Sequence, residues 1–369
     1  MEIEHRTQPL SRLTLHFAAC GAGDPVVLLH GWPQTWHEWR KVIALLAPHH
    51  RLVVPDLPGL GDSTPSPDGY AKQRLAAHLL ELADRLGLER FHLVGHDWGG
   101  PTAFAMACAA PERIRTLTVL DVTVPGVGPD LSQGGRRWHH AFHMTPSLPE
   151  ALVAGRERPY LGWFLDAFCW QRGAIAATDV DEYVRCYSRP GALAAGFAYY
   201  RAIPDDIAAN RAILASGFRL PMPVLALGGG RAEARGRGDE PLESLRLIAE
   251  HVEGGTIADC ARLDLAKAVF LPGPAGSLTI HNCRTLHYSA RNDSDLGRPL
   301  LLNTLTSADA MPYTVNPIKP KHDQFMVRGE RARFAHHDPR PCLIPPDWSK
   351  GYSSIFALQQ EEEAQAVAR

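Results

Sequence analysis

Residues 91–100 constrain the fold of this chain more than any other segment. They read FHLVGHDWGG, in which an apolar run leads into Gly95, His96, Asp97 and Trp98, and small residues then open a helix. An apolar run that ends in glycines predicts a buried strand turning sharply into the next element. Glycines two residues before and after the aspartate let the two backbone segments pass closely. The pattern therefore predicts that the turn lifts Asp97 above a sheet.

The side chain at this turn selects the chemistry. A serine attacks carbonyl carbon, whereas a carboxylate that attacked an acyl group would produce a reactive anhydride. An aspartate is better suited to displacement at saturated carbon, which leaves an ester for water to hydrolyse. Asp97 is therefore the candidate nucleophile, and epoxides or alkyl halides are the candidate substrates.

Two upstream segments support this interpretation. VVLLHGWPQTWHEW (26–39) is an apolar strand that runs into His-Gly-Trp-Pro, and RLVVPDLPGLGDSTP (51–65) is a strand followed by a Gly/Pro-rich loop. Together with the turn at the aspartate, these blocks resemble the epoxide hydrolase and haloalkane dehalogenase branch of the α/β-hydrolases, over about residues 8–258. The resemblance implies an α/β fold with a mostly parallel sheet and a helical lid. It also implies an oxyanion hole formed by the backbone amides of Trp32 and Trp98.

The acid of the catalytic triad has two candidate places, because it follows either the sixth or the seventh strand in this branch. The strand IRTLTVLD ends at Asp121, which follows Asp97 by 24 residues, the spacing of the sixth-strand variant. After the seventh strand the expected acidic position is Gly230, and Glu233 and Asp239 lie further along the loop. We predict Asp121; the alternative is that this residue only ends a strand or caps a turn.

The base of the triad is missing from its expected position. In the family a histidine follows the eighth strand at once and activates the water that hydrolyses the ester. Here the strand-like segment 251–260 continues as Ala-Arg-Leu-Asp (261–264), and the next histidine is His281. We therefore expect alkylation of Asp97 to proceed and hydrolysis of the ester to be slow or absent. The alternative is that a downstream histidine, His281 or His287, reaches the ester and restores turnover.

The C-terminal part stops resembling a hydrolase. Residues 257–363 are rich in β-branched, proline and glycine residues and resemble the second half of a phytanoyl-CoA dioxygenase-like protein, an Fe(II)/2-oxoglutarate double-stranded β-helix. The resemblance implies that His287 is a remnant iron ligand and that Arg298 is a remnant 2-oxoglutarate-binding residue. Such an iron site also needs an upstream His-x-Asp pair. None precedes His287, and the His-His-Asp sequence at 336–338 lies downstream.

The predicted organisation is therefore an α/β-hydrolase joined near residue 260 to an incomplete double-stranded β-helix. The core comprises residues 1–125 and 218–260, the helical lid residues 126–217, and the partial β segment with a frayed tail residues 261–369. Three hypotheses follow: an epoxide-hydrolase-type enzyme that is impaired or inactive, an incomplete oxygenase using Fe(II) and 2-oxoglutarate, and a non-catalytic fusion product.

The predicted lid contains candidate substrate contacts. In epoxide hydrolases two lid tyrosines donate hydrogen bonds to the epoxide oxygen; the resemblance places Tyr200 at the second position, with Tyr199 as its rival, and His139 at the other. The alternative is that these aromatic residues only pack the lid. Trp32 and Trp98 are also of the residue type that binds halide in dehalogenases, so an alkyl halide remains a candidate substrate. Because no arginine directly follows the nucleophile, a carboxylated substrate is disfavoured.

Composition excludes several other classes. A formal net charge of −2 over 369 residues argues against a nucleic-acid partner. The sequence shows no apolar run of membrane-spanning length and no signal peptide at its start, so no membrane association is expected. The 7 cysteines are scattered without C-x-x-C pairs, as expected for reduced thiols in a cytoplasmic protein rather than a zinc site. We expect the hydrolase part to bind a small hydrophobic epoxide or alkyl halide without a metal or organic cofactor.

Overall fold

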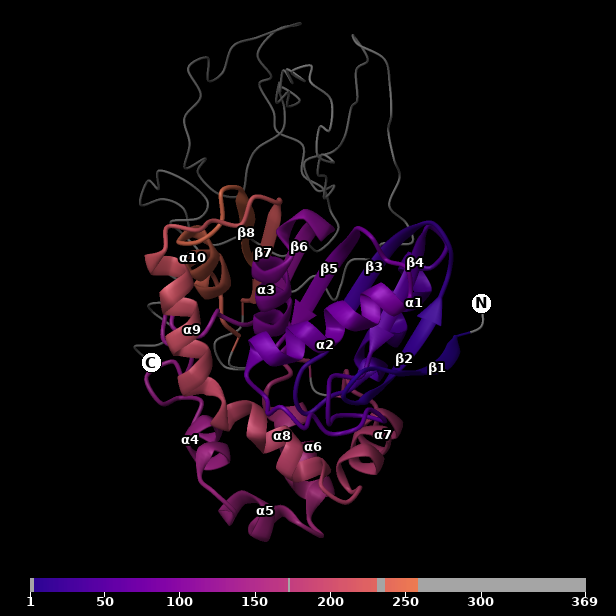
Figure 1. The fold of residues 1–369 in the computed structure, drawn as a ribbon. Helices are drawn as coiled ribbons and strands as arrows, with labels where there is room; N and C mark the ends of the chain where they lie inside the picture. The colour runs from indigo at the N-terminus through magenta and orange to yellow at the C-terminus, as the bar shows by residue number, and fades with distance from the viewer. Residues whose placement is uncertain (1–2, 172, 231–235, 258–369) are drawn as a thin grey trace, which may run out of the picture. The chain divides into compact units, whose positions relative to one another are not determined.

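The computed structural model describes residues 3–171, 173–230 and 236–257 (Figure 1). All of them belong to the first of the two units into which the chain divides, Met1–Phe270 and Leu271–Arg369. The segment that resembles a β-helix lies outside the described residues, and so do its candidates His287, Arg298 and the histidines and aspartate at 336–338. Glu233, an alternative triad acid, and His281, an alternative base, also lie outside the described residues.

Eight strands of the described residues form one sheet in the order β1-β2-β4-β3-β5-β6-β7-β8. β1 pairs with β2, and β2 with β4, in antiparallel fashion, whereas every other neighbouring pair is parallel. Parallel neighbours need a crossover, and here helices supply most of them. The strands are β1 (Glu4–Pro9), β2 (Thr14–Cys20), β3 (Asp24–Leu29), β4 (His50–Pro55), β5 (Phe91–His96), β6 (Ile114–Leu120), β7 (Val224–Gly229) and β8 (Val252–Ile257).

The central strands are largely apolar, as expected for a sheet covered on both faces. In β3, Val27 and Leu29 join the larger hydrophobic cluster on one face, and Val26 and Leu28 join the smaller cluster on the other. α2, α3 and α10 pack on the first face and α1 on the second. These four helices are α1 (Arg40–Leu46), α2 (Lys72–Arg85), α3 (Gly99–Ala109) and α10 (Glu240–Arg246).

The lid is inserted between β6 and β7, and most of its helices lie below the sheet in the view of Figure 1. In the described part of the chain it contains six helices. They are α4 (His139–Met144), α5 (Leu148–Val153), α6 (Glu157–Ala167), α7 (Ala177–Tyr187), α8 (Ala192–Arg201) and α9 (Ile203–Ala215). Two short 3-10 turns, η1 (Trp36–Trp39) and η2 (Pro111–Arg113), lie in the core.

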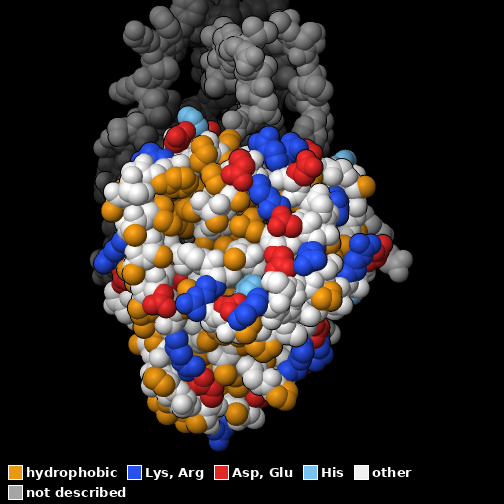
Figure 2. Space-filling model, in the orientation of Figure 1, with side chains coloured by type: hydrophobic (Ala, Val, Ile, Leu, Met, Phe, Trp, Pro, Cys, Tyr) orange, Lys and Arg blue, Asp and Glu red, His pale blue; other side chains and the backbone are white. Residues whose placement is uncertain are grey.

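Acidic and basic side chains are interspersed over the face shown in Figure 2, without a large area of one sign. This distribution agrees with the small net charge. In the part of the chain that the structure describes, we find no helix that is both long and apolar enough to span a bilayer.

Candidate active site

Asp97 occupies the sharp turn between β5 and α3 that the sequence predicts. Its φ is 46°, in the left-handed region that residues with a side chain rarely adopt. The two glycines that flank Asp97 lie so close to other backbone atoms that a side chain does not fit at either position. A Cβ on Gly95 would lie 2.2 Å from the carbonyl oxygen of Gly99, and a Cβ on Gly99 would lie 2.3 Å from that of Leu29. The turn is thus a strained backbone held by its neighbours.

The His-Gly-Trp-Pro loop that follows β3 holds the Asp97 carboxylate. The backbone amide of Trp32 donates a hydrogen bond to Asp97 Oδ1 at 2.9 Å. His30 anchors this loop, because its Nε2 accepts the amide of Leu57 at 3.0 Å while Nδ1 donates to the carbonyl oxygen of Gly31 at 2.9 Å. The Trp98 amide, the second predicted donor, makes no hydrogen bond with the Asp97 carboxylate among the described residues.

Asp121 lies at the end of β6 and faces the same cavity as Asp97. Its φ is 51°, and its Oδ1 accepts the backbone amides of Gly229 at 2.8 Å and Arg237 at 3.0 Å. Both donors come from β7 and the loop after it, the region that holds the acid in the seventh-strand variant. Asp239, the other described acidic candidate, instead accepts a hydrogen bond from the Thr256 hydroxyl at 2.7 Å.

A cavity of about 270 Å³ lies between the turn at Asp97 and the lid. Its walls are mainly apolar or aromatic, with a few ionisable groups. The lining residues are Trp32, Pro33, Gln34, His96, Asp97, Asp121, Arg137, His139, Phe164, Leu165, Phe168, Cys169, Ile175 and Tyr200. Apolar walls around two carboxylates suit a small hydrophobic electrophile.

Of the two candidate tyrosines, Tyr200 lines the cavity and Tyr199 does not. Tyr200 lines the cavity, and its ring centre lies 5.7 Å from that of His139, the other predicted contact. Burial, together with the charge of Asp97, raises the pKa of the Tyr200 hydroxyl well above its usual value, so this group remains a proton donor. Tyr199 points elsewhere, because its hydroxyl donates to the carbonyl oxygen of Pro58 at 2.8 Å.

His96 also lines the cavity, although the sequence pattern did not single it out. Its Nδ1 lies 3.2 Å from Glu38 Oε1. Burial opposes a charge on the ring, but the attraction of Glu38, with smaller contributions from Asp97 and Asp121, raises the pKa of His96 to about 9. His96 is therefore protonated at neutral pH and paired with a carboxylate. Its place next to Asp97 was the one signal for it in the sequence.

Arg137 is a second lining residue that sequence reasoning missed. Its side chain is buried, its Nε donates to Gln133 Oε1 at 3.1 Å, and its guanidinium lies 5.4 Å from the centre of the Phe168 ring. Burial and the nearby Arg237 lower the pKa of Arg137 to about 10, against the opposing attraction of Asp121 and Asp97. The cavity is therefore lined by a cation that the residues following Asp97 in the sequence did not predict.

Two further lid histidines are buried near the cavity and are neutral. Burial, followed by the charges of Arg137 and Arg237, lowers the pKa of His140 to about 3. Burial, followed by the charge of His140, lowers the pKa of His143 to about 2. His143 Nε2 lies 2.6 Å from the hydroxyl of Tyr160, within the aromatic packing of the lid. Groups with such low pKa values are poor proton acceptors.

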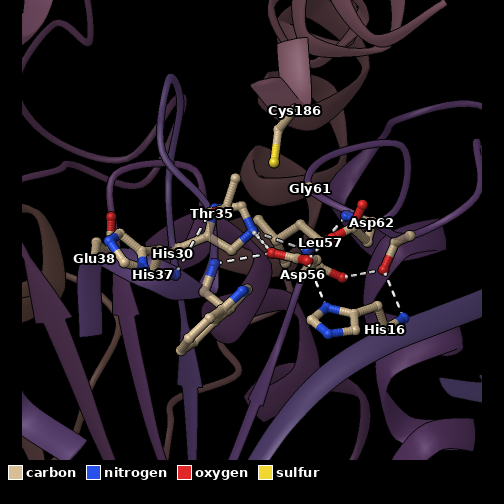
Figure 3. A network of polar contacts seen from close by, with 12 residues as sticks. His16, His30, Thr35, His37, Glu38, Asp56, Leu57, Gly61, Asp62 and Cys186 are labelled. Carbon is tan, nitrogen blue, oxygen red and sulfur yellow. Dashed lines mark hydrogen bonds and ion pairs between the residues drawn. The ribbon is translucent and has the colours of Figure 1, made fainter. Parts of the chain in front are cut away.

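A group of three residues of types that bind metal ions lies near the loop after β4 (Figure 3). Side-chain atoms of His16, Asp56 and Asp62 lie within 4.8 Å of one another. Asp56 is fully buried, and its oxygens already accept the backbone amides of Trp36 at 2.8 Å and Asp62 at 3.0 Å and lie 2.7 Å from His16 Nδ1. Asp56 is therefore saturated with hydrogen bonds, which fits a structural role better than metal binding.

The third member of this group is engaged by the lid. Asp62 forms ion pairs with Arg185 at 2.9 Å and with Arg189 at 2.6 Å. Burial raises the pKa of Asp62, but the hydrogen bond and charge of Arg185 outweigh it and lower the pKa below its usual value. The cluster thus connects the core loop to the lid and supports the loop that carries Trp32.

Comparison with known proteins agrees with this architecture. A family model described as alpha/beta hydrolase fold matches residues 24–178. The chain is similar to a soluble epoxide hydrolase of Corynebacterium sp. (strain C12), 33% identical over 273 residues, covering 70% of this chain and 91% of the relative. It is also 33% identical over 213 residues to a fluoroacetate dehalogenase of Burkholderia sp., covering 54% of this chain and 69% of that protein.

Solved structures give the same result. Wild-type Cfl2 from Burkholderia cenocepacia superimposes with a TM-score of 0.63 at 39% identity, covering 69% of this chain and 87% of that one. The fold and the site define an α/β-hydrolase. Within that family, the chain belongs to the branch that contains epoxide hydrolases and dehalogenases.

Proposed function

We propose that this protein is an epoxide-hydrolase-type enzyme in which Asp97 is the nucleophile, and that its second half-reaction is impaired. One observation carries the proposal. Asp97 stands on a left-handed turn, with Oδ1 bound to the Trp32 amide, at a cavity that also contains Asp121, His139 and Tyr200. A carboxylate presented in this way has one oxygen anchored and one available for attack.

The first half-reaction uses groups that all line the cavity. Asp97 Oδ2 attacks a ring carbon of the epoxide; a new C–O ester bond forms, the ring C–O bond breaks, and its electron pair stays on the departing oxygen. Tyr200, whose hydroxyl remains protonated, donates a proton to that alkoxide, and His139 donates a hydrogen bond. With an alkyl halide, the halide leaves with the electron pair and needs no proton.

The second half-reaction requires a base. Water must lose a proton as it attacks the ester carbonyl, and the amides of Trp32 and Trp98 stabilise the oxyanion that forms. The sequence places no histidine directly after β8, where the family carries its base. Among the described residues, His96 is already protonated by its pairing with Glu38 and cannot accept that proton. The ester is therefore expected to persist.

Asp121 has the position of the triad acid. Its two backbone donors keep its carboxylate fixed near the cavity, where it would orient and stabilise a protonated histidine. Without that histidine its contribution to turnover is lost, while its support for the loop after β7 remains.

The test is the intact mass of the purified protein after incubation with a panel of small epoxides and alkyl halides, followed by peptide mapping. We expect one adduct to accumulate on Asp97 without turnover. D97N is the matched control and should gain no mass. Halide release equal to one equivalent per chain would identify an alkyl halide as a single-turnover substrate.

Added imidazole provides a second readout. A small base that enters the cavity should accelerate loss of the adduct, since the missing group is a base rather than the nucleophile. Multiple turnover without a lasting adduct would instead mean that a downstream histidine supplies the base. Absence of both an adduct on Asp97 and turnover across the panel would refute the proposed nucleophile.

A further inference from the structure

A buried ion pair outside the cavity joins the lid to the core. Lys72, the first residue of α2, and Asp206 of α9 have side chains 1% and 0% exposed, and Nζ lies 2.9 Å from Oδ2. The backbone amide of Lys72 donates to Asp206 Oδ1 at 2.8 Å, so this lid carboxylate also caps the start of α2. Nζ donates in addition to the carbonyl oxygen of Tyr199 at 2.8 Å. Both α8 and α9 therefore hold one ammonium group of the core.

The same ammonium lies against Trp98. Nζ of Lys72 is 4.1 Å from the centre of the Trp98 ring, which is buried. A cation this close to a desolvated indole attracts its face. The Trp98 ring also meets the ring of Tyr200 at a centre-to-centre distance of 4.9 Å and nearly at right angles. Trp98 thus contacts both the lid-anchored cation and the lid tyrosine of the cavity.

The place of Trp98 gives these contacts their significance. Its peptide unit follows Asp97 directly, and its carbonyl oxygen accepts the hydroxyl of Thr102 at 2.7 Å at the start of α3. Movement of the indole would therefore be transmitted to the amide next to the nucleophile. A buried ion pair adds little stability relative to uncharged residues of similar volume. Attachment of the lid alone does not require a charge here.

We propose that Lys72 is a positioning residue: anchored by Asp206 and the Tyr199 carbonyl, it fixes Trp98 so that the Trp98 amide faces the reacting centre at Asp97. The effect on reaction rate rests on the proposed function. The effect on the mobility of the Trp98 ring does not, and it can be measured separately.

The experiment compares the full-length chain with K72M/D206N. This double variant removes both charges, and the D206N side chain keeps an Oδ1 acceptor for the amide of residue 72. Three quantities are measured: the denaturation midpoint, the rate of Asp97 alkylation by intact mass, and the ¹H–¹⁵N nuclear Overhauser effect of the Trp98 indole. W98F assigns that indole signal. R40M is the matched control, because it removes a different lid–core ion pair, the one between α1 and Asp179 of α7.

We expect K72M/D206N to unfold near the wild-type midpoint, to alkylate Asp97 at least about tenfold more slowly, and to lower the Trp98 indole Overhauser effect. R40M should keep the wild-type rate and the wild-type indole signal. An alkylation rate within about twofold of wild type, with an unchanged indole signal, would overturn the inference.

Two failures remain distinguishable. If the wild-type protein forms no adduct on Asp97, the proposed function fails and the indole signal alone decides the role of Lys72. If K72M/D206N does not fold, K72Q/D206N provides the same readouts, because it also leaves no unpaired buried charge and keeps a side-chain donor at residue 72. An unchanged indole signal in K72Q/D206N would then overturn the inference.

Discussion

Replacement of Gly31 by alanine tests the geometry of the site most directly. A Cβ on Gly31 would lie 2.2 Å from Asp97 Cβ and 2.6 Å from Asp97 Oδ1. Non-bonded carbon atoms have an optimal separation of about 3.5–4.0 Å, so the Asp97 side chain or the loop must shift by roughly 1 Å. The shift breaks the alignment with the Trp32 amide, which lies 2.9 Å from Oδ1.

The expected magnitude follows from that displacement. A misplacement of about 1 Å at a reacting group costs about a hundredfold in rate. We therefore expect G31A to alkylate at about one hundredth of the wild-type rate. Overpacking should lower the free energy of unfolding by about 1–3 kcal/mol, which leaves the protein folded at room temperature. The assay is the time course of adduct mass on Asp97 with one epoxide, beside a denaturant titration.

Gly162 offers a matched control. It lies within α6, and a Cβ there would meet nothing closer than Val180 Cγ1 at 4.0 Å. G162A should leave the alkylation rate unchanged and raise the free energy of unfolding by up to about 1 kcal/mol, because alanine is the better helix former. A folded G31A protein that alkylates within about threefold of wild type would refute the argument that close approach of the loop sets the position of Asp97.

Three other predictions test separate contacts. Glu38 raises the pKa of His96 from 6.5 to about 9, so this pair stabilises the fold fully below pH 6.5 and its contribution is lost as pH rises towards 9. Denaturation midpoints from pH 6 to 9 should fall more steeply in the wild type than in H96Q; parallel curves would contradict the pairing. Y200F should slow alkylation by an epoxide about a hundredfold and spare alkylation by an alkyl iodide, since iodide leaves without a proton; equal losses on both would exclude Tyr200 as the proton donor. Asp56→Ala removes the buried acceptor of two backbone amides and a histidine contact, and should cost about 3–5 kcal/mol of unfolding free energy. The exposed Asp84→Ala control should cost less than about 0.5 kcal/mol in the same titration. A similar loss of unfolding free energy in the two variants would contradict a structural role for Asp56.

The sequence determined the parts of this protein that depend on local patterns. Apolar runs separated by glycine-rich turns predicted the strands that build the parallel sheet, and an aspartate between two glycines predicted the turn that carries Asp97. The match with α/β-hydrolase relatives confirms this fold. The spacing to Asp121 also came from the sequence, and the structure brings that carboxylate to the same cavity. The roles of both aspartates remain predictions.

Only the tertiary structure decided which side chains surround the site. It directs Tyr200 into the cavity and Tyr199 towards Pro58, although adjacent residues with the same side chain are equivalent in a sequence pattern. It also pairs His96 with Glu38 and Lys72 with Asp206, partners separated by 58 and 134 residues. Local preferences act over one or two turns of chain, whereas burial, charge pairing and pKa depend on which distant segments the lid and core bring into contact.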